Sequence, residues 1–274
     1  MRQIDYKECF AKYEALLFDA YGVLMNGKGA LPGAAEALLW LNDQEIPWWV
    51  VTNGSSRTLT EAAAHYRKLG FSVADEQIIS SGSLLAEWFL NSGLQGPNTV
   101  VLGTDSSRQM VVDAGGEVVQ LGDHFDVVVL ADQSGFPFIE TMDFLLSRIC
   151  QQLDEGRKVK LVLTNPDLIY PKGNGSWGFT AGTMAQMLEG ALKLRFGEDS
   201  PQFCRLGKPY APIFREAYRR SGTMNMLMVG DQLETDMRGA TAFGIDGALF
   251  LSGLSSFDLA GQSQYAPRWI LKEW

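Results

Sequence analysis

The 274-residue chain has few cysteines and few histidines, and these scarcities exclude several classes of protein. Cys9, Cys150 and Cys204 are far apart, odd in number and without metal-ligand spacing. They predict a reducing, cytoplasmic compartment and argue against a disulfide framework. His65 and His124 have no serine or cysteine at a useful spacing, so a histidine-dependent catalytic triad is not indicated.

Long apolar runs and an excess of basic residues are also missing. No stretch approaches the roughly 18 consecutive apolar residues of a membrane span, and no signal peptide is expected at the N-terminus. The net charge of -9 argues against nucleic acid or an anionic membrane as a partner. It leaves room for a small anionic substrate, because a metal ion and a lysine can reverse the potential locally.

Short apolar runs alternate with longer helical patterns along the whole chain. The runs are ALLF before Asp19, WWVV before Thr52, TVVLG near Val101, VVVL before Ala131, KLVLT before Asn165, MLMVG before Asp231 and ALFL near Phe250. Several are apolar at successive positions, as expected for parallel strands buried on both faces. The alternation predicts an α/β fold with a mainly parallel sheet.

The middle of the chain has a strand–helix rhythm of its own. It predicts a separate, smaller α/β domain inserted at residues 83–180. Residues 1–82 and 181–274 are then expected to combine into one core domain.

Polar residues follow two of the predicted core strands directly. Asp19 ends the first, and Thr52, Asn53 and Gly54 end the second, just before a predicted helix. Ligands of open α/β sheets lie beyond the carboxyl ends of the strands. A hydroxyl and free backbone N–H groups at such a place are suited to bind an anion.

Charged residues come at two further strand ends. Lys208 stands in RLGKPY beside a short apolar stretch, and Asp231 and Asp236 stand in MVGDQLETD. Each alone is also typical of an ordinary turn or a solvated surface. Together with Asp19 they supply a nucleophile, a cation and hard oxygen ligands of the kind that suit Mg²⁺.

The segments FDAYGVLMNGKGALPGA, VVTNGSSR, TNPDLIYP…GFTAGT, GKPY and GDQLETDMRGA carry a resemblance to a known family. The chain resembles the haloacid dehalogenase (HAD) superfamily, most of all its subfamily IIA, with p-nitrophenyl phosphatase-like and sugar or nucleotide phosphatases. The resemblance implies a Rossmann-like core with an inserted α/β cap of the C2 type that sets substrate specificity. It also implies Mg²⁺-dependent hydrolysis of a small phosphorylated metabolite.

The resemblance assigns roles to the residues at the phosphoryl group. Asp19 would attack phosphorus and form an aspartyl-phosphate. Thr52 would donate its hydroxyl to the phosphoryl oxygens, with Asn53 and Gly54 beside it. Lys208 would bridge Asp19 and the phosphoryl group.

The resemblance also implies a metal site. Asp231 would bind Mg²⁺ together with Asp19, and the Tyr21 backbone carbonyl would be a further ligand. Asp236 would support the metal or orient Lys208.

Two residues after a strand of the inserted domain are further candidates for binding substrate. Asn165 and Asp167 could reach toward the substrate. A purely structural role, in a turn around Pro166, is equally consistent with the sequence. The substrate itself and the oligomeric state, a homodimer included, stay open.

Tyr21 is the main departure from the family pattern. Most phosphatases of the superfamily have an aspartate there, which protonates the leaving alcohol and then activates water. A phenol is far less acidic than a carboxyl group, and loss of a general acid–base costs about 10²–10⁴ in rate. The chain is then a slow or selective phosphatase, a non-catalytic binder of a phosphorylated ligand, or a dehalogenase-like hydrolase acting at carbon.

Tyr21→Asp tests the first of these alternatives. Since alkoxides need a proton to leave and aryloxides do not, this change should raise kcat for alkyl phosphates more than for aryl phosphates. Steady-state kinetics with one ester of each kind measures the difference. Equal effects on both would contradict the leaving-group explanation.

Overall fold

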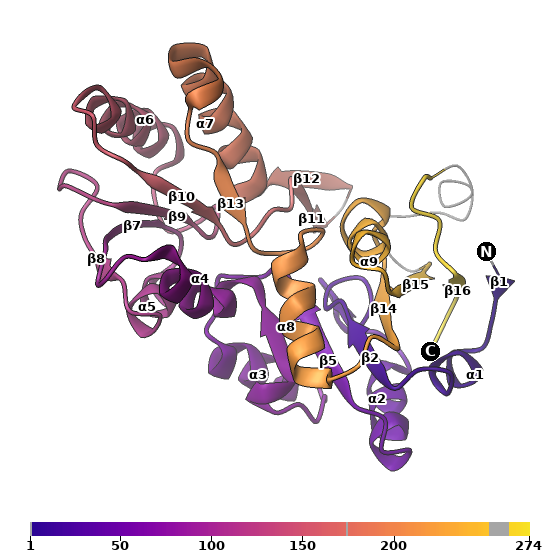
Figure 1. Ribbon diagram of the computed structural model, residues 1–274. Coiled ribbons are helices and arrows are strands. Elements are labelled where there is room, and N and C mark those ends of the chain that lie inside the picture. Colours follow the sequence, from indigo (N-terminus) through magenta and orange to yellow (C-terminus); the bar gives the residue numbers. More distant parts are fainter. Residues whose placement is uncertain (1, 174, 252–262) are drawn as a thin grey trace. The chain divides into compact units, whose positions relative to one another are not determined.

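A computed structural model describes residues 2–173, 175–251 and 263–274 (Figure 1). The chain divides into two compact units that are each built around a parallel sheet. Unit 1 comprises Met1–Thr52, Leu59–Ser80 and Lys208–Trp274, and unit 2 comprises Asn53–Thr58 and Ser81–Gly207. The predicted α/β fold with parallel sheets is confirmed.

The sheet of unit 1 has seven strands among the described residues, in the order β1-β16-β15-β14-β2-β5-β6, all parallel. These strands are β1 (Arg2–Gln3), β2 (Ala15–Phe18), β5 (Trp48–Thr52), β6 (Ile78–Ser80), β14 (Met226–Gly230), β15 (Asp246–Phe250) and β16 (Trp269–Leu271). A small antiparallel hairpin joins β3 (Met25–Asn26) to β4 (Gly29–Ala30).

Helices surround this sheet. They are α1 (Tyr6–Phe10), α2 (Ala34–Asp43), α3 (Leu59–Lys68), α8 (Ala211–Ser221) and α9 (Arg238–Phe243), with a π-helical turn at Leu233–Met237 and a 3₁₀ turn at Asp75–Gln77. Phe10, Phe18 and Trp48 lie in the buried core between the layers. The side chain of Trp274 closes this core, stacking on Phe250 with 4.8 Å between ring centroids.

The position of β2 in the sheet explains where the candidate site forms. All four of its residues are buried, as its continuous apolar sequence requires of a central strand. It lies between β14 and β5, with Phe18 opposite both Val229 and Val50. The residues that follow these three strands therefore come out at the same edge of the sheet.

Unit 2 has a five-stranded parallel sheet in the order β13-β10-β9-β7-β8. Its strands are β7 (Asn98–Leu102), β8 (Glu117–Val118), β9 (Val127–Leu130), β10 (Lys160–Leu163) and β13 (Phe203–Arg205), and its helices are α4 (Leu85–Ser92), α5 (Asp105–Asp113), α6 (Phe138–Asp154) and α7 (Ala181–Phe196), with 3₁₀ turns at Ser81–Leu84 and Gly197–Asp199. An antiparallel hairpin joins β11 (Ile169–Gly173) to β12 (Ser176–Phe179).

The predicted boundary of the inserted domain at residue 180 differs from the division in the structure. Residues 181–207 lie in unit 2 and not with the core. Ala185 and Leu188 of α7 pack in the same buried cluster as Leu161 of β10, and β13 pairs with β10. The apolar stripe of a helix predicts burial, but it does not say against which sheet.

Short strands were the elements that the sequence did not reveal. The predicted strands correspond to β2, β5, β7, β9, β10, β14 and β15, whereas β1, β6, β8, β13 and β16 were not predicted, and neither were the two hairpins. Strands of two or three residues have too little periodicity to stand out. None of the described helices has the length and apolar character that a bilayer crossing requires.

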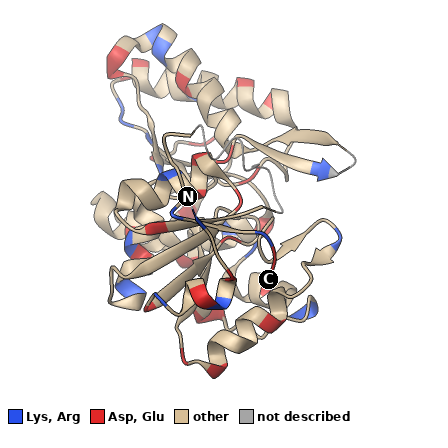
Figure 2. Ribbon diagram, turned by 90° about the vertical axis from the view of Figure 1, so that its right-hand side faces the viewer, with Lys and Arg blue, Asp and Glu red and all other residues tan. Residues whose placement is uncertain are grey.

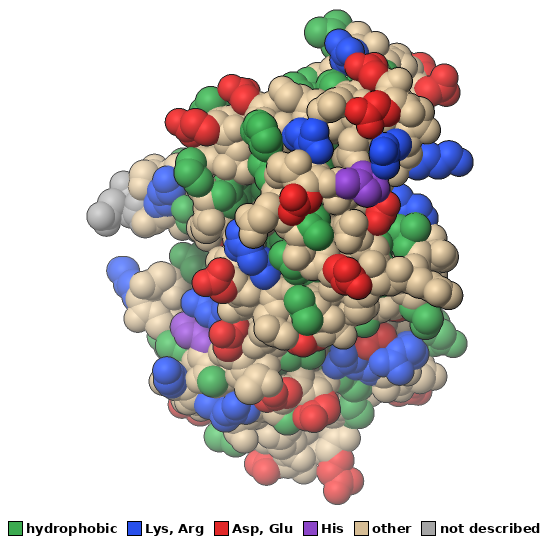
Figure 3. Space-filling view, turned by 90° about the vertical axis from the view of Figure 1, so that its left-hand side faces the viewer, with side chains coloured by type: hydrophobic (Ala, Val, Ile, Leu, Met, Phe, Trp, Pro, Cys, Tyr) green, Lys and Arg blue, Asp and Glu red, His purple; other side chains and the backbone are tan. Residues whose placement is uncertain are grey.

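Basic and acidic residues are interspersed along the chain (Figure 2). On the face in Figure 3, basic side chains alternate with acidic ones and form no continuous basic patch.

An ion-pair network around the buried Glu216 links α8 to β6, the edge strand of the unit 1 sheet. The Glu216 carboxylate accepts hydrogen bonds from Arg219 at 2.6 and 2.8 Å and from Arg220 at 2.7 Å. Arg220 in turn donates to the carbonyl oxygens of Glu76 and Ile78. Burial alone would raise the pKa of Glu216, but the two guanidinium groups outweigh it and lower the pKa below its ordinary value of 4.5.

Glu216→Gln should therefore destabilise the protein in a pH-dependent way. A lowered carboxyl pKa contributes stability that is present above pH 4.5 and lost as the pH falls below it. We expect a loss of about 1–3 kcal/mol at pH 7 that shrinks as the pH falls below 4.5. Urea unfolding across that range measures the loss, with Glu36→Gln, at an exposed position of α2, as the control. A pH-independent difference would contradict the ion-pair explanation.

Candidate active site

A buried ammonium group joins two carboxylates at the edge of the unit 1 sheet. Lys208 Nζ lies 2.7 Å from Asp19 Oδ1 and 2.7 Å from Asp236 Oδ1. Lys208 itself is only 2% exposed. Asp19 is fixed by its backbone, since its N–H donates to Val229 O at 2.9 Å. Its Oδ1 also accepts the Ala20 N–H at 2.8 Å.

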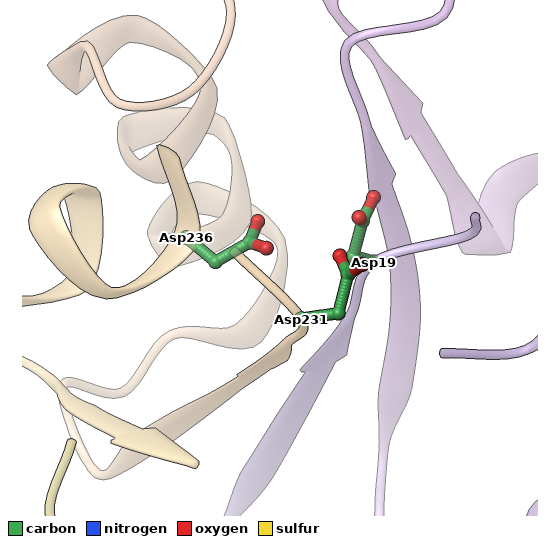
Figure 4. Close-up of side chains that lie close together, drawn as sticks. All are labelled: Asp19, Asp231 and Asp236. Atoms are coloured by element: carbon green, nitrogen blue, oxygen red, sulfur yellow. The ribbon is translucent and has the colours of Figure 1, made fainter. Parts of the chain in front are cut away.

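Asp231 completes a cluster of three buried carboxylates (Figure 4). One oxygen each from Asp19, Asp231 and Asp236 lies within 4.8 Å of the others. Asp19 follows β2, Asp231 follows β14, and Asp236 comes from the π-helical turn after β14. The structure thus brings together all three of the predicted carboxylates and the predicted lysine.

The charges in this cluster do not balance. Three carboxylates face one ammonium group, which leaves an excess of two negative charges when all are ionised. Burial alone would lower the pKa of Lys208, but Asp19 and Asp236 outweigh it and raise the pKa above its ordinary value. Burial raises the pKa of Asp236, against the lowering effect of Lys208, and the negative charge of Asp19 adds to the rise. The ammonium group therefore stays charged, but its single positive charge does not balance the three carboxylates.

Two glycines, which the sequence reasoning missed, allow the carboxylates to pack against the backbone. A Cβ at Gly22 would lie 2.3 Å from Asp231 Oδ2, and a Cβ at Gly230 would lie 2.3 Å from Asp236 Cγ. Gly22 also has a φ of +90°, which only glycine adopts easily. The sequence indicates them only by their positions: Gly230 directly precedes Asp231, and Gly22 follows soon after Asp19.

The residues present fit a divalent cation with a preference for oxygen ligands. Carboxylates are the donors that hold Mg²⁺ in proteins, and the cluster has the negative charge that such an ion would neutralise. The glycine at position 22 leaves room for Asp231.

Among the described residues, no side-chain contact joins Tyr21 to the carboxylate cluster. Its side chain is 40% exposed. A Cβ at Gly27 would lie 3.3 Å from the Tyr21 hydroxyl oxygen, so the ring extends along the β3–β4 hairpin. Its backbone forms an isolated bridge with Met25.

The other predicted substrate-binding residues divide between the two units. Thr52 is the last residue of β5 in unit 1, whereas Asn53, Gly54, Asn165 and Asp167 belong to unit 2. There the Asn53 side-chain amide donates to Asp167 Oδ1 at 2.8 Å, and Asn165 Oδ1 accepts the Asp167 N–H at 3.1 Å. The second bond forms the turn that was the structural alternative for these residues.

Two family models match the chain. The model described as haloacid dehalogenase-like hydrolase matches residues 16–117, and the model described as HAD-hydrolase-like matches residues 205–273. Together they cover Asp19, Thr52, Lys208, Asp231 and Asp236.

Several proteins that are similar to this chain are named as phosphatases. D-glycerol 3-phosphate phosphatase of Mycobacterium tuberculosis is 27% identical over 251 residues, which are 91% of this chain, and the chain spans 66% of that protein's length. A sugar phosphatase candidate of the HAD superfamily from Cytophaga hutchinsonii is 29% identical with a TM-score of 0.85, covering 100% of this chain and 98% of that one. A glycerol phosphate phosphatase of M. tuberculosis solved with magnesium is 26% identical with a TM-score of 0.77, and the match covers 96% of this chain and 75% of that one.

Gly22→Ala should weaken Mg²⁺ binding by at least about tenfold, equivalent to ~1.4 kcal/mol, because the new Cβ displaces Asp231. Isothermal titration with Mg²⁺ measures the affinity. Gly29→Ala is the matched control: its φ is +127°, but nothing lies within 4 Å of a Cβ there. Equal weakening in both variants would mean that backbone strain, and not Asp231, is responsible.

Proposed function

We propose, because this chain belongs to the haloacid dehalogenase-like hydrolases, that it is a Mg²⁺-dependent phosphatase acting on a small phosphorylated metabolite. The observation that carries the proposal is the position of Lys208 Nζ, 2.7 Å from both Asp19 and Asp236. A buried cation there can balance a carboxylate nucleophile and the oxygens of a phosphoryl group at once. Electrostatic stabilisation of those oxygens is the main demand of phosphoryl transfer.

The reaction proceeds in two displacements at phosphorus. A carboxylate oxygen of Asp19 attacks phosphorus, and the bond from phosphorus to the leaving oxygen breaks, with the electron pair going to that oxygen. Water then attacks the aspartyl-phosphate, which regenerates Asp19 and releases orthophosphate. Lys208 holds the phosphoryl oxygens in both steps, and the Thr52 hydroxyl donates to them.

Asp19, Asp231 and Asp236 would hold Mg²⁺ or support its ligands, with the Tyr21 carbonyl as a further ligand. When bound, the ion neutralises carboxylate charge and draws negative charge from the phosphoryl oxygens. The cluster supports this assignment because three carboxyl groups face a single ammonium group there. The glycines at positions 22 and 230 keep the carboxylates in place around it.

Tyr21 restricts the substrates that turn over well. No carboxyl group stands at position 21 to protonate a departing alkoxide, and the tyrosine side chain there is 40% exposed. Aryl and acyl phosphates, whose leaving groups are stable anions, are favoured by this arrangement. Unit 2 is the insertion that selects the substrate, and the three unpaired cysteines suit a cytoplasmic setting.

Removal of Asp19 or of the metal tests the proposal. With Mg²⁺ the protein should release p-nitrophenol from p-nitrophenyl phosphate. Asp19→Asn should lower kcat by at least about 10³-fold, since an amide cannot replace the nucleophile. EDTA should abolish turnover, and added Mg²⁺ should restore it. Asp43→Asn, which changes an exposed residue of α2, is the control, and its kcat should match that of the wild type.

Two other outcomes would contradict the proposal. Orthophosphate binding without hydrolysis of any aryl or acyl phosphate would indicate a binding protein. Metal-independent release of halide from 2-chloropropionate would indicate a hydrolase that acts at carbon.

A further inference from the structure

The chain passes between the two units at places that adjoin the proposed site. One crossing lies between Thr52 and Asn53, and another between Gly207 and Lys208. Each is one peptide bond from a group that the proposed reaction uses. How unit 2 holds Asn53 and Gly207 therefore affects the backbone of Thr52 and Lys208.

Unit 2 holds Asn53 at both its side chain and its backbone. The side-chain amide donates to Asp167 Oδ1 at 2.8 Å. The backbone carbonyl oxygen accepts the Ser81 hydroxyl at 2.9 Å. Asn53 is 3% exposed and Ser81 is fully buried, so the Ser81 bond is shielded from water, whereas Asp167 is half-buried.

Gly207 packs directly against the same asparagine. A Cβ at position 207 would lie 2.3 Å from Asn53 Oδ1 and 2.8 Å from Pro166 Cδ. Any side chain there would push away either Asn53 or the turn that follows β10. The two crossing segments and the turn at residues 165–167 thus form one packed group within unit 2, here called the clasp.

The turn is itself held rigidly. Asn165 Oδ1 accepts the Asp167 N–H at 3.1 Å, and the Asp167 carbonyl oxygen accepts the Thr180 hydroxyl and the Gly182 N–H. A Cβ at Gly182 would lie 2.3 Å from Pro166 O, so α7 begins in contact with the turn. The Asp167 carboxylate is therefore presented to Asn53 by a fixed backbone.

We propose that Asp167 is a positioning residue for the phosphatase reaction. Its carboxylate fixes the Asn53 amide, and through the clasp it sets the backbone that carries Thr52 and Lys208. This inference rests on the proposed function. It differs from the expectation that Asp167 contacts the substrate, because the carboxylate acts on Asn53 and not on a leaving group.

A double-mutant cycle separates the two roles. The variants are Asp167→Ala, Asn53→Ala, their combination and Asp167→Asn, which keeps an oxygen that accepts a hydrogen bond. Each is assayed with Mg²⁺ on p-nitrophenyl phosphate, an alkyl phosphate and acetyl phosphate, and for inhibition by inorganic phosphate. Asp105→Ala, an exposed acid of α5, is the control in unit 2.

A positioning role gives a distinct set of results. Asp167→Ala should lower kcat/KM about tenfold, equally for all three substrates, and should weaken inhibition by phosphate. The kcat/KM of Asp167→Asn should lie within about threefold of the wild-type value. Asn53→Ala should have the same effect, and the combination should be no worse than either alone. Thermal unfolding shows which variants are folded. If Asp167→Ala does not fold, Asn53→Ala tests the same bond, with uniform loss across substrates as the criterion.

Several results would overturn the inference. These are multiplying effects in the combination, a loss that depends on the leaving group, or an Asp167→Asn variant as impaired as Asp167→Ala. If the wild type hydrolyses no phosphate ester, the proposed function fails. The Mg²⁺-dependent affinity for inorganic phosphate is then the measurement that tests the role of Asp167. If the wild type does not bind inorganic phosphate, or if Asp167→Ala binds it as tightly as the wild type, the inference is overturned as well.

Discussion

The ion pairs of Lys208 with Asp19 and Asp236 are the interaction on which the chemistry of this molecule depends. Buried charges are costly unless each has a partner, and here three carboxylates share one ammonium group. The remaining negative charge suits the divalent cation of the proposed function. The same ammonium group can then neutralise part of an incoming phosphoryl group. Charge balance thus links the fold, the metal and the reaction.

This arrangement requires close approach between strands that are distant in the sequence. β2 and β14 are neighbours, and their parallel register brings Asp19 and Asp231 to one edge. Gly22 and Gly230 remove the side chains that would otherwise fill the space of the acidic groups. The carboxylate cluster is therefore a product of sheet order and of small residues together. Tyr21, which directly precedes Gly22, extends along the β3–β4 hairpin.

The clasp in unit 2 is the basis for the proposal that a side chain outside the reacting groups positions them. Asn53 and Gly207 are the first and last residues of the chain in unit 2, and both contact the turn that carries Asp167 or its neighbour Pro166. Asn53 and Gly207 are each joined by one peptide bond to a residue of the proposed site, Thr52 and Lys208 respectively. The hydrogen bond between Asn53 and Asp167 links residues 114 positions apart in the sequence.

The sequence by itself determined the α/β class, the strands with long apolar runs, and the polar residues that end them. It did so because continuous apolar runs indicate buried parallel strands and because ligands meet such strands at their carboxyl ends. Only the tertiary structure decided that residues 181–207 belong with the inserted unit, that Lys208 lies between Asp19 and Asp236, and that Asp167 contacts Asn53. The physical reason is that hydrophobic patterning specifies which residues are buried, whereas the choice of neighbour depends on strand order, on the packing of helices against a particular sheet, and on the places where a glycine allows two segments to touch.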